Sequence, residues 1–570
     1  MTVALDAGLR IPMRDGAELA ADLYLPAGTA EPRGTVLVRT PYDRAVWRPG
    51  AKGADEAELF AGEGFAVVVQ DVRGTGESDG EFHVFRHERD DGYETVDWIA
   101  RQPWSNRRVG TFGCSYLGEV QVLLATTRHP CHVAMVPMAS AGALHEFGAR
   151  VGGAVDLLDT VAYFASHGAT RERRSRPEID VERAVWTLPP SRAIADAGGP
   201  VSDFEQIVLS EPGDAWWIEV TRQVTDEDRF DVPALFLDSW YDQRPAKTLA
   251  LAERLRATSC SPAARRNQFV VIAPGTHCAW SKLRERTLVG ELDVGDARFP
   301  LERLWVAWFR HWLDAAAPGD FPLAPLTYYT IGANAWRTAP SWPPPGGASL
   351  TLALAGDGDA AQPGRAGRLV QGTVDEDGHD AYVYDPEDPC PTVGGLSYYP
   401  GLGVAGAADQ RPLLARSDVA VYLGDVLAHE LEVTGEPRVV IWFSSSAEDT
   451  DLVLKLLDVD PGGRALNVTQ TILRLRYRDG LTRPRALVPD EPERVTVELG
   501  AVSYRLAAGH RIGLLVTSSN FPAHDRNTNT NLPLDRAAHC LRATNRIHHG
   551  PSARSELHLP IAAAASACDT

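Results

Sequence analysis

The sequence predicts an α/β domain with a helical insertion, followed by a domain of β-strands, and three observations lead to this fold class. In the first third of the 570 residues, short apolar runs alternate with helix-forming segments, as in a doubly wound sheet. The alternation stops between about residues 141 and 231 and then resumes. Beyond a stretch rich in Pro, Gly and Ala at 337–368, short strand-like runs follow one another without helices.

The first domain begins with strands that we expect to be buried on both faces of a parallel sheet. Residues 34–40 and 65–71 are mainly apolar and rich in valine, as such strands usually are. Residues 54–62 contain good helix formers and end at a glycine, which indicates a helix between the two strands. The same alternation predicts, in chain order, a helix over 90–102, a strand over 108–113, a helix over 116–128 and a strand over 132–138.

The insertion is the segment that lacks this alternation. It contains helix-like runs, Trp186, the Trp216-Trp217 pair and a charge cluster that begins at Arg171. We interpret it as a helical cap on the α/β domain.

After the insertion the alternation resumes and then gives way to strands alone. Residues 233–238 and 268–274 are predicted strands, and a helix with its apolar face between Leu301 and Trp312 closes the α/β domain. Turn signals such as Asp460-Pro-Gly-Gly separate some of the later strands, which are predicted at 438–443, 452–457, 494–499 and 511–516. Many short strands without helices predict a β-sandwich, of the jelly-roll type.

The predicted domain boundaries follow from these changes in pattern. The α/β domain is expected to comprise residues 1–140 and 232–335, the helical cap residues 141–231, and the C-terminal jelly-roll β domain residues 336–570.

The strand at 108–113 leads directly into Gly113-Cys-Ser115 and then into a predicted helix. A strand–turn–helix elbow holds a serine in a strained conformation, with its hydroxyl exposed above the sheet of an α/β-hydrolase. Ser115 is therefore the predicted nucleophile, and a turn serine without a catalytic role is the alternative. The usual elbow has its second glycine two residues after the serine, whereas here Gly118 follows three residues after it.

A serine nucleophile needs a histidine to take its proton and an acid to orient that histidine. In this fold the acid and then the histidine follow the serine along the chain, each at the end of a later strand. His277 comes just after the strand at 268–274. Asp242 follows the strand at 233–238, and Asp238 is a competing acid.

Several motifs along the chain carry a family resemblance. In the first part they are Thr40-Pro-Tyr-Asp, Asp71-Val-Arg-Gly-Thr-Gly, Gly113-Cys-Ser-Tyr-Leu-Gly, Trp240-Tyr-Asp and Pro274-Gly-Thr-His, and in the last part Ser444-Ser-Ser-Ala-Glu-Asp-Thr-Asp and Ser518-Ser-Asn-Phe-Pro. Together they resemble the cocaine-esterase-like family, which includes X-prolyl dipeptidyl aminopeptidases, α-amino-acid ester hydrolases and glutaryl acylases. The late second glycine of the elbow fits this family. The resemblance also implies that Asp242, rather than Asp238, completes the triad.

By the same resemblance, Tyr42 would donate its hydroxyl to the oxyanion, alongside the backbone N–H of Tyr116. A tyrosine that is uncharged at neutral pH offers one aimed donor where negative charge develops. The alternative is a tyrosine that only packs at the end of its strand.

Two residues beside the predicted acid are expected to contact substrate, namely Trp240 and Arg244. A partly buried arginine binds a carboxylate with two parallel hydrogen bonds, so Arg244 would favour an anionic acyl or leaving group. Pairing with Glu253 or Asp238, or simple solvation, is the alternative.

Composition and charge exclude several classes of partner and cofactor. The formal net charge of −20, from 56 basic and 76 acidic residues, argues against nucleic acid or an anionic membrane. The first residues show no signal peptide and no apolar run could span a bilayer, so we expect a cytoplasmic protein.

Asp449, Asp451 and Asp458 match no compact calcium loop and are expected to be solvated turn residues, so we predict no metal.

The seven cysteines show neither metal spacing nor a paired framework. Free thiols in a reducing cytosol are the expectation. Cys114 and Cys278 flank Ser115 and His277, and alternation along a strand would point them away from the site and into the core.

These residues predict a serine hydrolase that cleaves a carboxylic ester or amide of a small molecule through an acyl-serine intermediate. Acyl transfer to an amine or alcohol needs the same triad and stays open. X-prolyl peptidases usually carry an extra N-terminal helical domain, and this chain begins with strand-like residues, so that activity is less favoured. A binding role for the β domain is the alternative of a different class. No cofactor is expected, and a homo-oligomer stays open.

Overall fold

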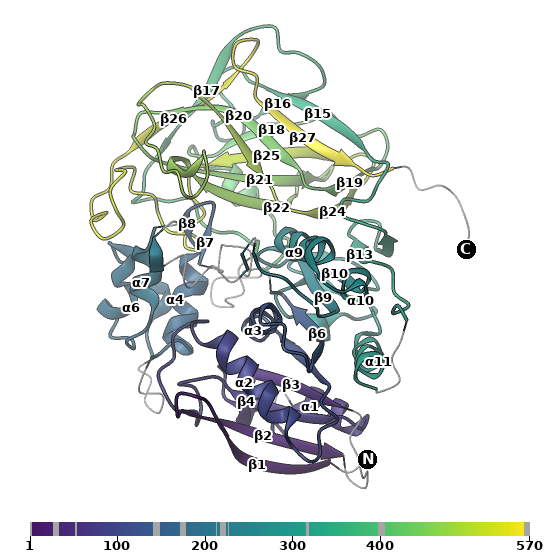
Figure 1. The fold of residues 1–570 in the computed structure, drawn as a ribbon. Coiled ribbons are helices and arrows are strands. Elements are labelled where there is room, and N and C mark those ends of the chain that lie inside the picture. The colour runs from purple at the N-terminus through teal and green to yellow at the C-terminus, as the bar shows by residue number, and fades with distance from the viewer. Residues whose placement is uncertain are drawn as a thin grey trace.

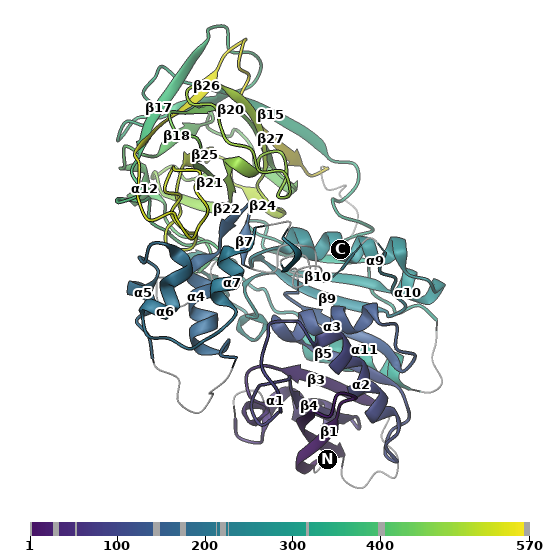
Figure 2. The same cartoon turned by 60° about the vertical axis from the view of Figure 1, so that its left-hand side comes forward.

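The computed structural model describes residues 3–563 except 27–33, 52–53, 141–148, 171–177, 212–213, 217–223, 226, 315–318 and 397–404. The described chain forms an α/β domain, a helical segment beside it, and a β domain that lies over both (Figures 1 and 2). The charge cluster at Arg171 and the indole of Trp217 fall outside the described residues.

A ten-stranded sheet forms the centre of the α/β domain. Its spatial order is β1 (Val3–Pro12), β2 (Glu18–Pro26), β4 (Ala66–Asp71), β3 (Thr35–Thr40), β5 (Val109–Cys114), β6 (His132–Met138), β9 (Ala234–Tyr241), β10 (Gln268–Thr276), β13 (Leu326–Thr330) and β14 (Ala335–Ala339). The strands from β4 to β13 run parallel, while β1, β2 and β14 pair with antiparallel neighbours. The parallel centre brings the carboxyl ends of these strands to one edge, where a site is expected in an open α/β sheet.

Helices cover both faces of this sheet. They are α1 (Ala54–Gly62), α2 (Glu88–Ala100), α3 (Tyr116–Thr126), α9 (Pro245–Thr258), α10 (Pro262–Arg266) and α11 (Leu301–Leu313), and the hairpin β11 (Leu288–Val289) to β12 (Leu292–Asp293) precedes α11. On one face α1 meets α11 through an edge-to-face contact of Phe60 with Phe309, 5.3 Å between ring centroids. On the other face Ile99 of α2 and Leu124 of α3 share a core cluster with Val68 of the sheet. The predicted helix at 54–62 and strand at 132–138 are confirmed residue for residue.

The segment after β6 contains mainly short helices. Among the described residues its elements are β7 (Arg150–Val151), β8 (Ala154–Val155), α4 (Leu157–Ser166), α5 (Val181–Ala184), η3 (Pro190–Arg192), α6 (Ala193–Asp196) and α7 (Phe204–Leu209). The helices gather at one side of the molecule, where the α/β domain meets the β domain (Figures 1 and 2). The interpretation as a helical segment is thus confirmed for the described residues, with the β7–β8 hairpin as an addition.

The C-terminal domain is built on a thirteen-stranded sheet network. Its strands are β15 (Ala348–Ala355), β16 (Gly367–Val370), β17 (Gly378–Tyr384), β18 (Ala420–Leu423), β19 (Leu431–Gly435), β20 (Arg438–Ser445), β21 (Asp451–Val459), β22 (Ala465–Arg474), β23 (Glu493–Glu498), β24 (Val502–Leu506), β25 (Arg511–Thr517), β26 (Ala543–His549) and β27 (Glu556–Ile561). The described residues also form the short helix α12 (Arg411–Leu414) and the 3-10 helix η6 (Leu475–Tyr477). Central strands such as β21 are buried along their whole length. The β-rich character that the short apolar runs predicted is confirmed.

Backbone hydrogen bonds join the β domain to both other parts. The Ile331 N–H donates to the Ser503 carbonyl (3.0 Å) and the Arg505 N–H donates to the Ile331 carbonyl (2.8 Å), which ties the end of β13 to β24. The Arg474 N–H donates to the Gly152 carbonyl (2.9 Å) in the β7–β8 hairpin. The β domain therefore fixes the helical segment as well as the sheet.

A buried ionic cluster lies beside the junction between Arg474 and the β7–β8 hairpin. Arg474 pairs with Asp451 (2.9 Å) and Asp525 (3.0 Å), and all three side chains are 1% exposed. Asp525 also accepts a hydrogen bond from the Val155 N–H of β8 (2.7 Å). Asp449 pairs with Arg476 at 3.3 Å and is likewise buried.

The expectation that Asp449, Asp451 and Asp458 are solvated turn residues is wrong. All three are buried, and Asp458 accepts hydrogen bonds from Tyr504 (2.9 Å) and His510 (2.7 Å). A buried carboxylate needs such partners because desolvation penalises its charged form.

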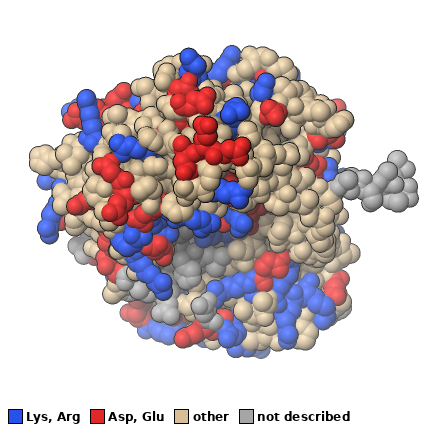
Figure 3. All heavy atoms as spheres, turned by 90° about the horizontal axis from the view of Figure 1, so that it is seen from above, with Lys and Arg blue, Asp and Glu red and all other residues tan. Residues whose placement is uncertain are grey.

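No helix among the described residues combines the length and apolar character needed to cross a bilayer. Acidic and basic side chains are interspersed on the face seen in Figure 3. The net charge of −20 therefore does not gather as one acidic patch on that face.

Candidate active site

Ser115 lies in the turn between β5 and α3 with φ 64° and ψ −125°. Non-glycine residues rarely adopt a positive φ, so the surrounding bonds must hold this turn. The Ser115 N–H donates to the Met138 carbonyl of β6 (2.9 Å), and the Ser115 carbonyl accepts from the N–H groups of Gly118 (2.8 Å) and Glu119 (3.0 Å). The side chain itself stays partly exposed.

Two glycines make this turn sterically possible. A Cβ at Gly113, where φ is +145°, would lie 2.4 Å from the Leu117 Cβ. A Cβ at Gly118 would lie 2.5 Å from the Met138 carbonyl oxygen of the neighbouring strand. The glycine three residues after the serine is therefore required where α3 crosses β6 closely.

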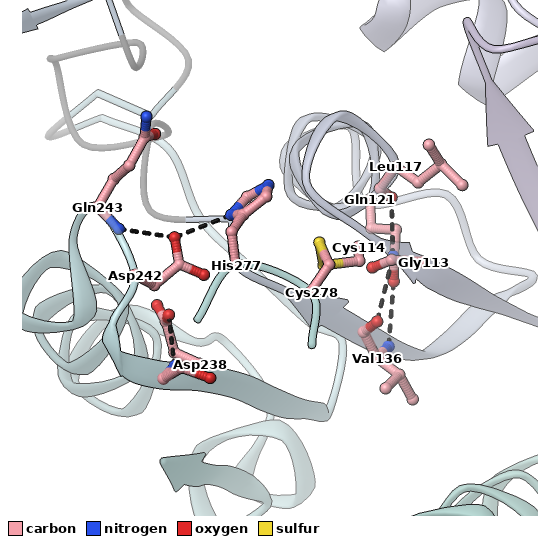
Figure 4. The surroundings of a disulfide bond; sticks show 11 residues. Gly113, Cys114, Leu117, Gln121, Val136, Asp238, Asp242, Gln243, His277 and Cys278 are labelled. Carbon is pink, nitrogen blue, oxygen red and sulfur yellow. Dashed lines mark hydrogen bonds and ion pairs between the residues drawn. A yellow bond between two sulfur atoms is a disulfide. The ribbon is translucent and has the colours of Figure 1, made fainter. Parts of the chain in front are cut away.

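His277 and Asp242 face each other at the carboxyl ends of β10 and β9 (Figure 4). Asp242 Oδ1 lies 2.8 Å from His277 Nδ1 and also accepts the Gln243 N–H at 2.6 Å. Asp242 is 3% exposed. The competing acid, Asp238, instead accepts hydrogen bonds from the Ser239 N–H (2.7 Å) and the Thr248 hydroxyl.

The surrounding carboxylates control the protonation of this histidine. Burial is the largest single influence and disfavours the imidazolium, but the charge and hydrogen bond of Asp242, with Asp238 and Asp159, outweigh it and raise the pKa of His277 above its usual value. Burial and the charge of Asp242 raise the pKa of Asp238 well above the ordinary aspartate value. These carboxylates thus stabilise an imidazolium at His277.

Tyr42 lies just after the end of β3 and is partly buried. Burial raises the pKa of its phenol to about 12, against the opposing effect of a hydrogen bond with Ser115. Its ring meets His167 edge to face, at 4.9 Å between centroids. The hydroxyl is therefore a neutral donor beside the candidate nucleophile.

Tyr116 is the first residue of α3, so its backbone N–H has no carbonyl partner within the helix. The helix dipole adds positive potential at this end. The side chain points elsewhere: its hydroxyl donates to Glu88 at 2.7 Å, and Glu88 pairs with Arg39 at 2.7 Å. All three side chains are buried.

This Arg39–Glu88–Tyr116 network was not predicted from the sequence. It joins β3, which precedes Tyr42, to the first turn of α3. Burial raises the pKa of Glu88 despite the neighbouring Arg39. A charged residue near the end of an otherwise mainly apolar buried strand, as Arg39 is, was the available signal, because such a charge needs a partner.

A cavity of about 310 Å³ opens beside Asp242 and is lined by all three parts of the molecule. Arg244 borders it, is 7% exposed and donates from Nη2 to the Arg150 carbonyl at 2.8 Å. Trp240 also borders it, and its indole N–H donates to the Tyr329 carbonyl at 2.6 Å. The structure thus places both predicted contact residues at the cavity, and Arg244 is not solvated.

The helical segment contributes two carboxylates to this cavity, Asp156 and Asp159. The Gln243 amide donates to both, at 3.0 and 3.1 Å. Burial and the charge of Asp159 raise the pKa of Asp156 well above its usual value, while Arg244 acts in the opposite direction. Sequence reasoning missed this pair because the segment carried no strand or motif that placed it near Asp242.

The expectation of free thiols is wrong for two cysteines. Cys114 and Cys278 form a disulfide, with 6.1 Å between their Cα atoms, and Figure 4 shows it between His277 and the turn at Gly113. Both residues lie where the chain leaves a strand, and Cys278 has φ 51°. Strand alternation does not govern their direction there.

Comparison with known proteins matches both halves of the chain to one group. Residues 15–279 match the family described as X-Pro dipeptidyl-peptidase (S15 family), and residues 321–558 match the X-Pro dipeptidyl-peptidase C-terminal non-catalytic domain. The cocaine esterase of Rhodococcus sp. (strain MB1 Bresler) is 32% identical over 580 residues, which cover 97% of this chain and 98% of that protein.

Solved structures agree with these matches. An aminopeptidase from a marine sediment archaeon (Thaumarchaeota archaeon) superposes with a TM-score of 0.82 and 25% identity, covering 99% of this chain and 96% of that one. An α-amino-acid ester hydrolase superposes with a TM-score of 0.79 and 25% identity, covering 98% and 97%.

Proposed function

The chain belongs to the X-Pro dipeptidyl-peptidase (S15) family, with a cocaine esterase as a full-length relative, and from this premise we propose that Ser115, His277 and Asp242 form its catalytic triad. The protein is a serine hydrolase of the esterase and peptidase type. The observation that carries the residue assignment is the 2.8 Å contact of His277 with Asp242, at the strand ends that face the Ser115 turn. Hydrolysis of a carboxylic ester or amide needs this arrangement.

In the proposed mechanism, the Ser115 Oγ attacks the substrate carbonyl while His277 accepts the hydroxyl proton. Because Asp242 engages Nδ1, Nε2 is the nitrogen that accepts it. The raised pKa of His277 favours the imidazolium that forms in this step. His277 then protonates the leaving group, and water attacks the acyl-serine by the reverse route.

The developing oxyanion would be bound by the Tyr42 hydroxyl and the Tyr116 N–H. Support comes from the hydrogen bond between Tyr42 and Ser115 and from the position of Tyr116 at the start of α3. Donors already in place need no reorganisation when charge develops, which is why such groups contribute strongly to rate.

We assign a substrate-binding role to the cavity beside Asp242. Helices α4–α7 would act as the cap, since Asp156 and Asp159 at the start of α4 line this cavity. The β domain, which we still predict to be a jelly roll, would close the opposite wall with β22 residues such as Ile472. The predicted domain boundaries and a cytoplasmic location likewise stay predictions.

The residues that line the cavity support two hypotheses about the charge of the substrate. Arg244 would bind an anionic acyl or leaving group, as proposed from the sequence, and Trp240 would supply an apolar contact. The pair Asp156 and Asp159 favours instead a protonated amine, because a bound cation would stabilise both carboxylates in their ionised forms. Two structural neighbours are named an aminopeptidase and an α-amino-acid ester hydrolase, which accords with the second reading.

Substrates of matched size separate these readings. We would compare kcat/KM for neutral, carboxylate-bearing and amine-bearing acyl esters in wild type, Arg244→Leu and Asp159→Asn. Loss of a buried charge-assisted contact costs about 1.5–3 kcal/mol, so the matching substrate alone should lose roughly 10- to 150-fold. Equal losses on all three esters would remove both residues from recognition. An added amine or alcohol acceptor in the same assay tests acyl transfer by its product.

The triad itself is tested with a fluorophosphonate, which reacts with activated serines. Wild type should be labelled once, at Ser115, and Ser115→Ala should lose both labelling and turnover while keeping its melting temperature. Stoichiometric labelling of the variant at another serine refutes the assignment.

A further inference from the structure

The Cys114–Cys278 disulfide joins the neighbours of two proposed catalytic residues. Cys114 is the last residue of β5 and directly precedes Ser115, while Cys278 directly follows His277. The two cysteines are 164 residues apart in sequence. In the sheet, β6 and β9 lie between β5 and β10. The bond therefore links two strand ends that share no hydrogen-bonded edge.

Each end of this link is held firmly on its own side. The Ser115 backbone is bonded to β6 through Met138, and His277 is bonded to Asp242 after β9. A displacement between the two sides would therefore change the distance from Ser115 to His277 while leaving each local set of bonds intact. The disulfide opposes this displacement directly.

We propose that the Cys114–Cys278 disulfide is a positioning element that holds Ser115 and His277 in register for proton transfer, so that its reduction lowers turnover. The proposal rests on the triad proposed above. Proton transfer is sensitive to such register, because misplacement by about 1 Å costs on the order of 10²-fold in rate. Substrate binding should change little, since the Asp242 cavity is lined by other residues.

The bond is accessible to a small reductant, because both cysteines are partly exposed. A thiolate of a dithiol attacks one cysteine sulfur, the S–S bond breaks and a mixed disulfide forms. The second thiolate of the dithiol then displaces the protein sulfur. The dithiol leaves as its cyclic disulfide, and Cys114 and Cys278 each end as a thiol, having gained two electrons and two protons together.

Other cysteines supply matched controls. Among the described residues, Cys131 and Cys390 are buried free thiols, Cys540 is partly exposed and Cys260 is exposed. Cys260→Ala removes an accessible thiol without touching the disulfide. It should keep wild-type turnover and wild-type sensitivity to a dithiol.

The experiment treats full-length enzyme with dithiothreitol, alkylates it and counts modified cysteines by mass spectrometry. On a p-nitrophenyl ester, we expect reduction at Cys114 and Cys278 to lower kcat at least 10-fold, with KM within about twofold. The pH midpoint of kcat should stay in place because the His277–Asp242 contact persists. Reoxidation should restore kcat. A purely structural bond would not give this separation of kcat from KM.

The variant Cys114→Ala/Cys278→Ala decides the case where reduction also disturbs the fold. Measured below its melting temperature, the folded variant should show the same loss of kcat and no response to dithiothreitol. Verified reduction without loss of kcat, or a folded double variant with wild-type kcat, overturns the proposal. Activity retained in Ser115→Ala would instead overturn the proposed triad, so the two failures are distinguishable.

Discussion

Tyr42→Phe removes one hydroxyl from the site and leaves the rest of the side chain in place. The lost group is the partner of Ser115, whose hydrogen bond acts on the pKa of the Tyr42 phenol. The ring contact with His167, 4.9 Å between centroids, is available to phenylalanine as well. The substitution therefore isolates the proposed oxyanion donor, while the Tyr116 N–H remains as the second donor.

Loss of one oxyanion donor costs about 2.7–4 kcal/mol of transition-state stabilisation, equivalent to roughly 10²- to 10³-fold in kcat. The ground-state carbonyl carries little charge, so KM should change by less than about twofold. Because burial raises the Tyr42 pKa to about 12, the hydroxyl stays protonated across the working range. The kcat of wild type and variant should then depend on pH in the same way, with lower values for the variant at every pH.

Stopped-flow release of p-nitrophenol measures the acylation rate directly, and steady-state assays supply kcat and KM. Tyr24→Phe is the matched control, because it removes a buried hydroxyl that donates to the Trp47 carbonyl at 3.0 Å. That variant should retain wild-type rates. An acylation rate within threefold of wild type for Tyr42→Phe would show that Tyr42 only packs at the strand end.

Three further outcomes are expected. Because the proposed base, His277, would act in its neutral form, activity should rise as pH rises through its raised pKa. Asp159→Asn removes one charge that raises this pKa, so the midpoint of kcat/KM against pH should fall; an unmoved midpoint would exclude this coupling. Glu88→Gln leaves Arg39 buried without its ion pair and should lower the unfolding free energy by about 3–5 kcal/mol, as read from denaturant melts; a change below 1 kcal/mol would contradict the burial argument. A chain of residues 1–340 should be insoluble or inactive because it exposes the apolar face covered by the β domain; a soluble and fully active fragment would contradict this.

The parts of the fold with strict periodicity were predictable from the sequence. The strand over 132–138 and the helix over 54–62 agree with the structure at both ends. The apolar run of the strand and the helix-forming composition of the helix are local features, which can be recognised within the segment itself. The helix expected over 90–102 instead spans Glu88–Ala100. Its first residue, Glu88, is buried against Arg39 and Tyr116, and these contacts, distant along the chain, explain why a glutamate begins the helix inside the core.

Polar residues within the β domain show where such reasoning fails. Asp449 and Asp451 stand in a run of Ser, Asp and Thr that has the composition of an exposed turn. The burial of Asp451 depends on its ion pair with Arg474 and that of Asp449 on its ion pair with Arg476, and both arginines lie more than twenty residues away along the chain. A polar run of residues indicates that burying its carboxylates would cost free energy. Whether that cost is offset depends on the side chains that lie nearby in the folded structure, and the run itself does not reveal them.

At the candidate site itself, the prediction that failed is that of free thiols at Cys114 and Cys278. Alternation along a strand would turn Cys114 away from Ser115 and Cys278 away from His277, yet that rule holds only while the chain stays extended. Ser115 has φ 64° and Cys278 has φ 51°, so the chain turns at both positions. The backbone conformation that exposes the candidate nucleophile thus also directs the preceding thiol toward the histidine loop. Cysteines next to triad residues at strand ends should therefore be considered as a pair before they are assigned to the core.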